Sequence, residues 1–341
     1  MNESLPTLDE LLALARLADP AGYSPLGDQP FLLFRAAPAK PAQARELAAW
    51  LRQLPCPVLC IAGPRSAKAL VDAADVVLAK VEDSALLTTA IRRNPIAAMT
   101  FVQLLRATEH LPIEDALLAE SLAYATLQSG AEYRAWLEAH RAAAPAPSTD
   151  DGPAVVATRS GNELALELNR PSNNNAINIE MRDALVEALR LVLADRSIRR
   201  LHLSGRGRCF STGGDLTEFG TVPDPALGHA VRSLTLPARL LAQCARRATV
   251  HVHSACIGAG IELPAFARRV TASSNAFFQL PELKFGLIPG AGGTVSLPRR
   301  IGRQRSAWLV LSGRKINART ALDWGLVDGI APPIARPDDR R

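Results

Sequence analysis

Short apolar segments alternate with amphipathic helical segments through the second half of this chain, and that alternation constrains the fold more than any other feature. Leu164, Leu166 and Leu168 share one face of a predicted strand, and residues 180–194 carry the buried stripe of a predicted helix. Further strands are expected at 200–203, 249–253 and 269–273, with helices near 225–245 and 258–267. Strands that are separated by helices usually pair in parallel, so the sequence predicts an α/β fold with a parallel-rich sheet covered by helices.

A run rich in proline, alanine and serine at residues 142–153 has the composition of a linker. Before it, residues 31–80 alternate between strand and helix patterns, and residues 84–141 are helical throughout. A chain of 341 residues suits two packed units. The predicted divisions are a lead helix within 1–30, a small α/β segment at 31–90, a helical region at 91–141, the linker at 142–153, an α/β core at 154–333 and a tail at 334–341.

The composition excludes several classes of protein. The formal net charge is +6, but the arginines form isolated pairs and aromatic residues make up only 5% of the chain. A surface that binds nucleic acid would instead need a basic stripe with interleaved aromatic residues. No apolar run reaches the roughly 18–20 residues that a membrane span requires. The five cysteines are scattered and odd in number, which indicates a reducing compartment. We therefore expect a cytoplasmic protein that binds neither nucleic acid nor membrane.

Two glycine-rich segments, Cys209–Leu216 and Cys256–Glu262, stand where a strand gives way to a helix. Glycine allows a tight turn there and leaves main-chain amides accessible, and the start of a helix adds partial positive charge. Each segment taken alone is more often a simple turn. Two such junctions that face one another would provide a pair of amide donors for a developing oxyanion.

Two glutamates accompany these segments. Glu262 lies in the first turn of the predicted helix, and Glu282 follows it by 20 residues in a predicted loop. The intervening helix and return strand can bring both carboxyl groups to one end of the sheet. Two carboxyl groups that share an apolar pocket acquire different pKa values, so that one holds a proton while the other accepts one. The alternative is a helix-capping acid and a solvated loop residue. The acid/base interpretation requires tips no more than about 7 Å apart, within reach of one bridging water.

The other reactive side chains give weaker signals. His251 and His253 lie on one face of a predicted strand, but no third metal ligand is evident nearby. Cys56 and Cys60 fall in a predicted buried strand rather than in a redox turn. The sequence therefore predicts no metal site and no redox cofactor.

Five segments of the second half, in order and in spacing, resemble the crotonase (enoyl-CoA hydratase/isomerase) family. They are Phe210–Leu216, Ile257–Leu263, Leu280–Glu282, Gly286–Thr294 and Ala321–Asp328. The resemblance covers about residues 155–331, half of the chain. It implies the parallel-sheet spiral of the ClpP/crotonase fold for the core, preceded here by a mixed α/β and helical N-terminal region.

The resemblance also implies a reaction, the addition of water across the double bond of a 2-enoyl-CoA thioester. The amides of Gly214 and Ala259 match the oxyanion positions, and Glu262 and Glu282 match the acid/base pair of the family's hydratases. Coenzyme A enters as part of the substrate. The positions that the resemblance assigns to its binding are Arg170, Ala176, Asp215 and Leu216.

Two other functions stay open. The same site could serve an enoyl-CoA isomerase or a specialised acyl-CoA dehydratase, although isomerases of the family usually lack the carboxylate that matches Glu262. A non-catalytic CoA-binding or scaffold subunit is the other alternative, which the retention of both carboxylates disfavours. Two departures from the family pattern place the details of CoA binding in doubt. Many members have a lysine where this chain has Thr217, and glycine is usual where it has Ser254.

The family's C-terminal helices, which pack in its trimers, have no counterpart after residue 331 in this sequence. Residues 94–141 resemble those helices instead, and residues 31–80 resemble a decayed copy of the core without its glutamate. We therefore expect a circular permutation, or a fusion to a degenerate copy, that places the helical tail before the core. By resemblance the protein is also expected to form a homo-oligomer, a trimer or a dimer of trimers.

Overall fold

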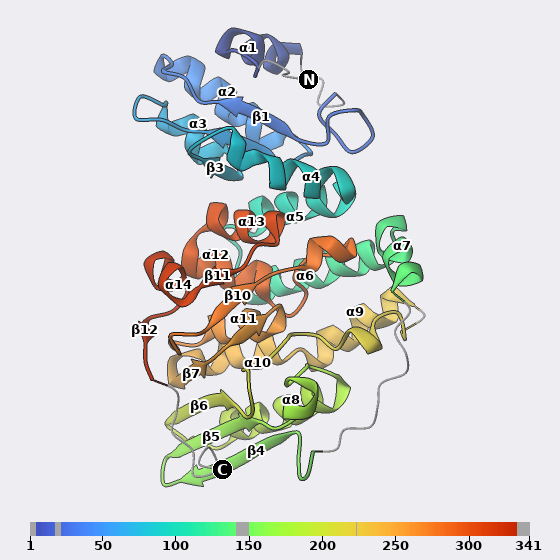
Figure 1. Cartoon of the computed structure of the whole chain (residues 1–341), viewed down its shortest axis with the longest axis vertical. Helices are drawn as coiled ribbons and strands as arrows, with labels where there is room; N and C mark the ends of the chain where they lie inside the picture. The colour runs from blue at the N-terminus through green and yellow to red at the C-terminus, as the bar shows by residue number, and fades with distance from the viewer. Residues whose placement is uncertain (1–4, 18–21, 141–149, 223, 333–341) are drawn as a thin grey trace.

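The computed structural model describes residues 5–17, 22–140, 150–222 and 224–332 (Figure 1). Most of the expected linker and the whole expected tail lie outside these residues. The described chain forms three sheets, one before the linker and two after it. In Figure 1 the N-terminal α/β unit lies at the top, the largest sheet at the bottom, and a layer of helices from both halves of the chain between them.

The N-terminal unit is a three-stranded parallel sheet with strand order β1-β2-β3. Every residue of the central strand β2 is buried, as expected for a strand covered on both faces. Its core, which includes Leu47, Leu51 and Phe34, is distinct from the main core of the molecule. The elements are α1 (Leu8–Leu17), β1 (Leu32–Arg35), α2 (Pro41–Gln53), β2 (Val58–Ile61), α3 (Lys68–Ala73) and β3 (Val76–Leu78).

Four helices follow, as the apolar spacing over 84–141 predicts. They are α4 (Ala85–Arg93), α5 (Pro95–Thr108), α6 (Ile113–Gln128) and α7 (Ala131–Ala139). Proline starts α5 and precedes α6, where its missing N–H costs no helical hydrogen bond. These helices pack on the second half of the chain, with α5 and α6 against α12 (Gly293–Ile301) and α4 and α5 against α13 (Arg303–Ser312). The expected helical tail therefore lies beside the core although it precedes the core in sequence.

The largest sheet has six strands in the order β12-β9-β7-β6-β5-β4, and all pairs are parallel except the β4–β5 hairpin. Leu164, Leu166 and Leu168 are buried on β5, which confirms the predicted alternation. Asn178 caps α8 (Ile179–Ala194) by accepting a hydrogen bond from the Met181 amide at 2.9 Å. The strands are β4 (Val155–Ser160), β5 (Glu163–Leu168), β6 (Arg200–Gly205), β7 (Ala248–Val252), β9 (Arg269–Ala272) and β12 (Gly329–Ile330).

A second, three-stranded sheet, β11-β10-β8, carries the expected site segments. Two helices differ from expectation, because prolines interrupt them. The region 225–245 divides at Pro237 into two helices, and the region 258–267 forms one helical turn before Pro264 starts a 3₁₀ segment. The remaining elements are β8 (Ala255–Ile257), α9 (Pro225–Thr235), α10 (Pro237–Cys244), α11 (Ala259–Glu262), β10 (Phe277–Gln279), β11 (Ile316–Asn317) and α14 (Ala318–Trp324).

A buried ionic cluster joins the two halves of the chain. Asp75, at the start of β3, is 1% exposed and accepts hydrogen bonds from Arg106 of α5 and from Arg303 of α13, each at 2.9 Å. Its second oxygen accepts from the Val58 amide at 2.8 Å. Both arginine side chains are less than a tenth exposed. One aspartate thus accepts hydrogen bonds from two buried guanidinium groups that come from different halves, and Glu109 lies 3.5 Å from Arg303.

Candidate active site

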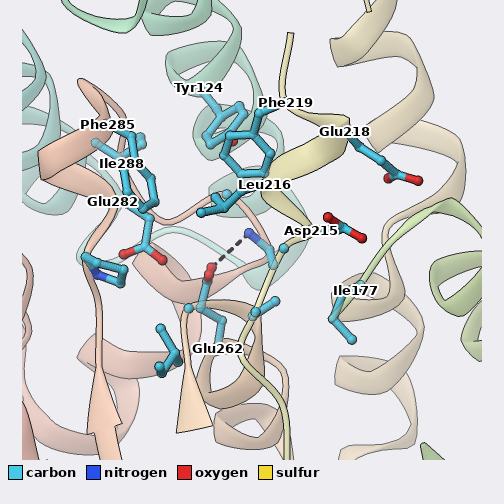
Figure 2. Close-up of a pocket in the computed structure, with 18 of the residues that line it drawn as sticks. Tyr124, Ile177, Asp215, Leu216, Glu218, Phe219, Glu262, Glu282, Phe285 and Ile288 are labelled. Carbon is cyan, nitrogen blue, oxygen red and sulfur yellow. Dashed lines mark hydrogen bonds between the residues drawn. The ribbon is translucent and has the colours of Figure 1, made fainter. Parts of the chain in front are cut away.

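A cavity of about 480 Å³ lies between the second half of the chain and the helices that precede the linker (Figure 2). Both glycine-rich segments and both predicted glutamates line it. The wall opposite them includes Tyr124 and Gln128 of α6, Tyr133 of α7 and Arg232 of α9. The expected site is therefore formed as one cavity, and helices from the N-terminal half complete it.

The two glycine-rich segments run side by side. Ser211 and Cys256 form a parallel bridge, in which the Ile257 amide donates to the Ser211 carbonyl at 3.1 Å. A Cβ atom added to Gly213 would lie 2.6 Å from the Ile257 carbonyl oxygen, so only glycine fits this approach. Beyond the bridge, the amides of Gly214 and Ala259 line the cavity, and neither donates to an acceptor within the described residues. These are the two amides that the sequence predicts as oxyanion donors.

The turn at Gly258 brings the two glutamates together. Gly258 has φ +51° and ψ −123°, a conformation that favours glycine. The position of its missing Cβ lies 2.7 Å from Glu282 Oε1 and 3.8 Å from Glu262 Oε1. The two oxygens are therefore no farther apart than the sum of these distances, which is below the separation of about 7 Å that a single bridging water sets. Figure 2 shows the two carboxyl groups pointing toward one another.

Glu262 is 2% exposed and is held by the loop that starts α12. Its Oε2 accepts hydrogen bonds from the amides of Ala291 and Gly293, each at 2.8 Å. Burial, followed by the nearby charges of Glu282 and Glu120, raises the pKa of Glu262 well above its ordinary value, against the two amide bonds that lower it. The side chain is thus fixed in position, and the raised pKa favours the protonated form of its carboxyl group.

Glu282 starts a short 3₁₀ segment after Pro281, and its Oε2 is buried without a hydrogen-bond partner within the described residues. Burial also raises the pKa of this carboxyl group, with Glu120 as a further cause. An unpartnered buried carboxyl oxygen is costly in a protein interior. Glu282 is one of the residues that line the cavity.

A third buried glutamate, Glu120, comes from α6 and is 1% exposed. Its carboxylate accepts hydrogen bonds from the amides of Gly292 and Thr294 at 2.7 and 2.9 Å, and from the Thr294 hydroxyl at 2.7 Å. Glu120 and Glu262 therefore hold alternate amides of the same loop. The N-terminal half fixes in this way the loop that positions Glu262, and this contact was not predicted from the sequence.

Of the four positions that the resemblance assigns to CoA binding, two line the cavity and two do not. Asp215 and Leu216 lie at its edge, and Asp215 accepts hydrogen bonds from the Thr217 amide and hydroxyl. Arg170 is instead buried in an ion pair with Glu180. Ala176 is also buried outside the lining, and its neighbour Ile177 faces the cavity.

Sequence reasoning missed Tyr124 and Gln128 as cavity residues. A signal for them existed, because Glu120, Tyr124 and Gln128 are spaced four apart and therefore share one face of a helix. A Cβ added to Gly290 would lie 2.4 Å from the Tyr124 ring, so the ring lies directly on the backbone of the α12 loop. No local pattern indicates that this face of the helix meets that loop.

The described residues contain no cluster of histidine, cysteine and carboxylate side chains that could hold a metal ion. His251 instead bonds to Thr271 and Ser273, and His253 bonds to the Gly207 carbonyl. Within the part of the chain that the structure describes, no helix has the length and apolar character needed to cross a membrane.

The chain belongs to the enoyl-CoA hydratase/isomerase family, whose model matches residues 159–335. The predicted crotonase fold and family are thereby confirmed for the second half of the chain. The residues before the match are not assigned by it.

Two curated relatives come from Escherichia coli (strain K12). The chain is 39% identical over 168 residues to 1,2-epoxyphenylacetyl-CoA isomerase, a match that covers 48% of this chain and 64% of that protein. It is 36% identical over 178 residues to 2,3-dehydroadipyl-CoA hydratase, covering 52% and 69%. The chain thus spans less than two thirds of the first relative. Among solved structures, an enoyl-CoA hydratase/isomerase-family protein from Mycobacterium abscessus is 30% identical with a TM-score of 0.50, covering 52% of this chain and 71% of that one.

Proposed function

We propose that this chain is an enoyl-CoA hydratase that acts through Glu262 and Glu282. The observation that carries the proposal is the convergence of these two carboxyl groups, of which Glu262 is buried and Glu282 partly buried, beside two main-chain amides that have no acceptor among the residues that the structure describes. The amides belong to Gly214 and Ala259, and they would hold the carbonyl oxygen of a CoA thioester. Asp215 and Leu216, at the edge of the cavity, would contact the CoA portion.

Each group in the cavity then has a chemical task. One glutamate removes a proton from a water molecule as its oxygen bonds to C3 of the enoyl group. The electron pair of the double bond moves toward the thioester, and the two amides stabilise the resulting enolate oxygen. The other glutamate delivers a proton to C2. The raised pKa values allow the pair to keep one proton near neutral pH, so that one acid and one base are present together.

The proposal is tested by incubating the protein with crotonyl-CoA and with longer and aromatic 2-enoyl-CoA thioesters. Hydration removes the conjugated double bond and adds the mass of water, which is detected by absorbance and by mass spectrometry in ¹⁸O-labelled water. Incorporation of the label supports hydration. Binding of these thioesters with no turnover on any of them would contradict the proposal and favour a non-catalytic CoA-binding subunit.

A second candidate is isomerisation at the same site, which the similarity to 1,2-epoxyphenylacetyl-CoA isomerase favours. An isomerase moves a proton and gains no oxygen from solvent. A product of unchanged mass from a 3-enoyl-CoA or an epoxide substrate, with no labelled oxygen, would select this reaction.

The homo-oligomeric state stays a prediction.

We expect kcat/KM for hydration to show a bell-shaped pH dependence that lies at higher pH than ordinary glutamates would produce. Catalysis needs the singly protonated pair, and the pKa values of both carboxyl groups are raised by burial. Activity should therefore rise as pH increases through the lower apparent pKa, which lies above that of an ordinary glutamate. It should fall again when the second proton is lost. A profile whose acid limb lies at or below about pH 4.3, the ordinary value for glutamate, would contradict this expectation.

A further inference from the structure

The lining of the cavity includes a cationic side chain that has no carboxylate partner among the described residues. Two cationic side chains, Arg182 and Arg232, are among the described residues that line the cavity. Arg182 has its counter-ion in Asp183, 2.7 Å away. No carboxylate of the described residues lies within ion-pair distance of Arg232, although this side chain is only partly exposed. A partly buried guanidinium group without a paired carboxylate can bind an anionic partner.

The guanidinium group is held in a fixed orientation by α6. Its Nε donates to the Ser121 hydroxyl at 3.0 Å, one terminal nitrogen donates to Gln128 Oε1 at 3.2 Å, and the other donates to the Ser121 carbonyl at 3.3 Å. It also lies over the Tyr124 ring, 4.7 Å from the ring centroid. These bonds use three of the five N–H groups of the arginine. These bonds leave one N–H group on each terminal nitrogen, and such groups can donate to a carboxylate.

The carboxyl group of Glu120, which interacts with Arg232, does not fill this position. Glu120 is close enough to stabilise the charged form of Arg232, but its two oxygens accept three bonds from the α12 loop. The side chains of Ser121 and Gln128, which accept hydrogen bonds from Arg232, and the ring of Tyr124 beneath the guanidinium group all come from α6. Apolar side chains such as Leu236 and Leu263 also line the cavity.

We propose that Arg232 binds a carboxylate at the far end of the acyl group, so that the substrates are enoyl-CoA thioesters whose chains end in a carboxylate. This inference rests on the proposed function, because it assumes that an acyl-CoA thioester occupies the cavity. Arg232 acts as a specificity-determining residue and takes no part in proton transfer.

The test compares pairs of 2-enoyl-CoA thioesters of matched chain length, one ending in a methyl group and the other in a carboxylate. At the chain length that reaches Arg232, wild-type kcat/KM should be at least about tenfold higher for the carboxylate, since a charge-assisted hydrogen bond is stronger than a contact with a methyl group. Arg232→Met should remove this preference by lowering kcat/KM for the carboxylate about 10- to 100-fold while leaving the methyl-ended substrate nearly unchanged. Arg190→Leu, which removes the same charge from an exposed position on α8, should preserve the preference.

Two measurements separate the failure of this inference from that of the proposed function. Equal or better turnover of the methyl-ended substrate at every chain length, or an equal loss for both substrates in Arg232→Met, overturns the role of Arg232 and leaves hydration intact. Calorimetric binding of saturated acyl-CoA pairs gives the same comparison without any turnover. If no thioester is hydrated, tighter binding of the carboxylate form to wild type than to Arg232→Met still supports the site, and equal binding overturns it.

Discussion

Replacing either cavity glutamate, by Glu262→Gln or Glu282→Gln, should lower kcat for hydration by at least about 100-fold. Each glutamine keeps the size and one hydrogen-bond acceptor of the original side chain but cannot exchange a proton. A loss of this size equals about 2.7 kcal/mol of transition-state stabilisation and is typical when a positioned acid or base is removed. Because the two groups act on one water and one enolate, the double variant should lose much less than the product of the two single losses.

The matched control is Glu187→Gln, which makes the same substitution at an exposed position of α8 and should leave kcat unchanged. Circular dichroism and thermal unfolding of all variants would show that the fold is intact. Wild-type turnover in either single cavity variant would remove the two-glutamate mechanism.

The largest effect on stability should come from Asp75→Asn. This change removes the buried negative charge that pairs with both Arg106 and Arg303 in the interior. Breaking a buried ion pair on one side typically costs about 3–5 kcal/mol, because the remaining charge stays desolvated. Glu109 lies 3.5 Å from Arg303 but is itself partly exposed, so it compensates only in part. Urea denaturation would measure the change in the free energy of unfolding.

Asp72→Asn is the matched control for this prediction. Asp72 pairs with Lys68 four residues away on α3, and both side chains are more than half exposed. An exposed pair of this kind contributes about 0–1 kcal/mol. A loss for Asp75→Asn as small as that of Asp72→Asn would mean that solvent or a neighbouring carboxylate already neutralises the two arginines.

The core of the fold could be predicted from local sequence patterns. Alternation of Leu164, Leu166 and Leu168 placed β5, and the stripe of apolar residues placed α8, because each pattern reflects burial of a single face. The limits of the helices were less certain. Pro237 and Pro264 end helical segments that the apolar spacing alone would continue.

The placement of the two glutamates followed from the motifs, but the details that fix them did not. Gly258 permits the turn beside both carboxyl groups, a role that is expected for a glycine-rich segment. The contact of Glu120 with the α12 loop joins residues 172 positions apart in sequence. No local pattern specifies such a pair, and the same holds for Arg232 and its partners on α6. Arg170 shows a limit of the resemblance. It stands at a position that the resemblance assigns to CoA binding, but its side chain is buried in an ion pair with Glu180.

The wall contributed by α6 has a consequence for how this protein can change over evolutionary time. Glu120 and Tyr124 precede the linker, yet they touch the loop that orients Glu262, and the charge of Glu120 is one of the causes that raise the pKa of Glu262. Substitutions in the first half can therefore retune the acidity of the reacting pair while every family motif stays intact. The second half carries the motifs that identify the family, and the first half contributes to the acidity of the catalytic carboxyl groups.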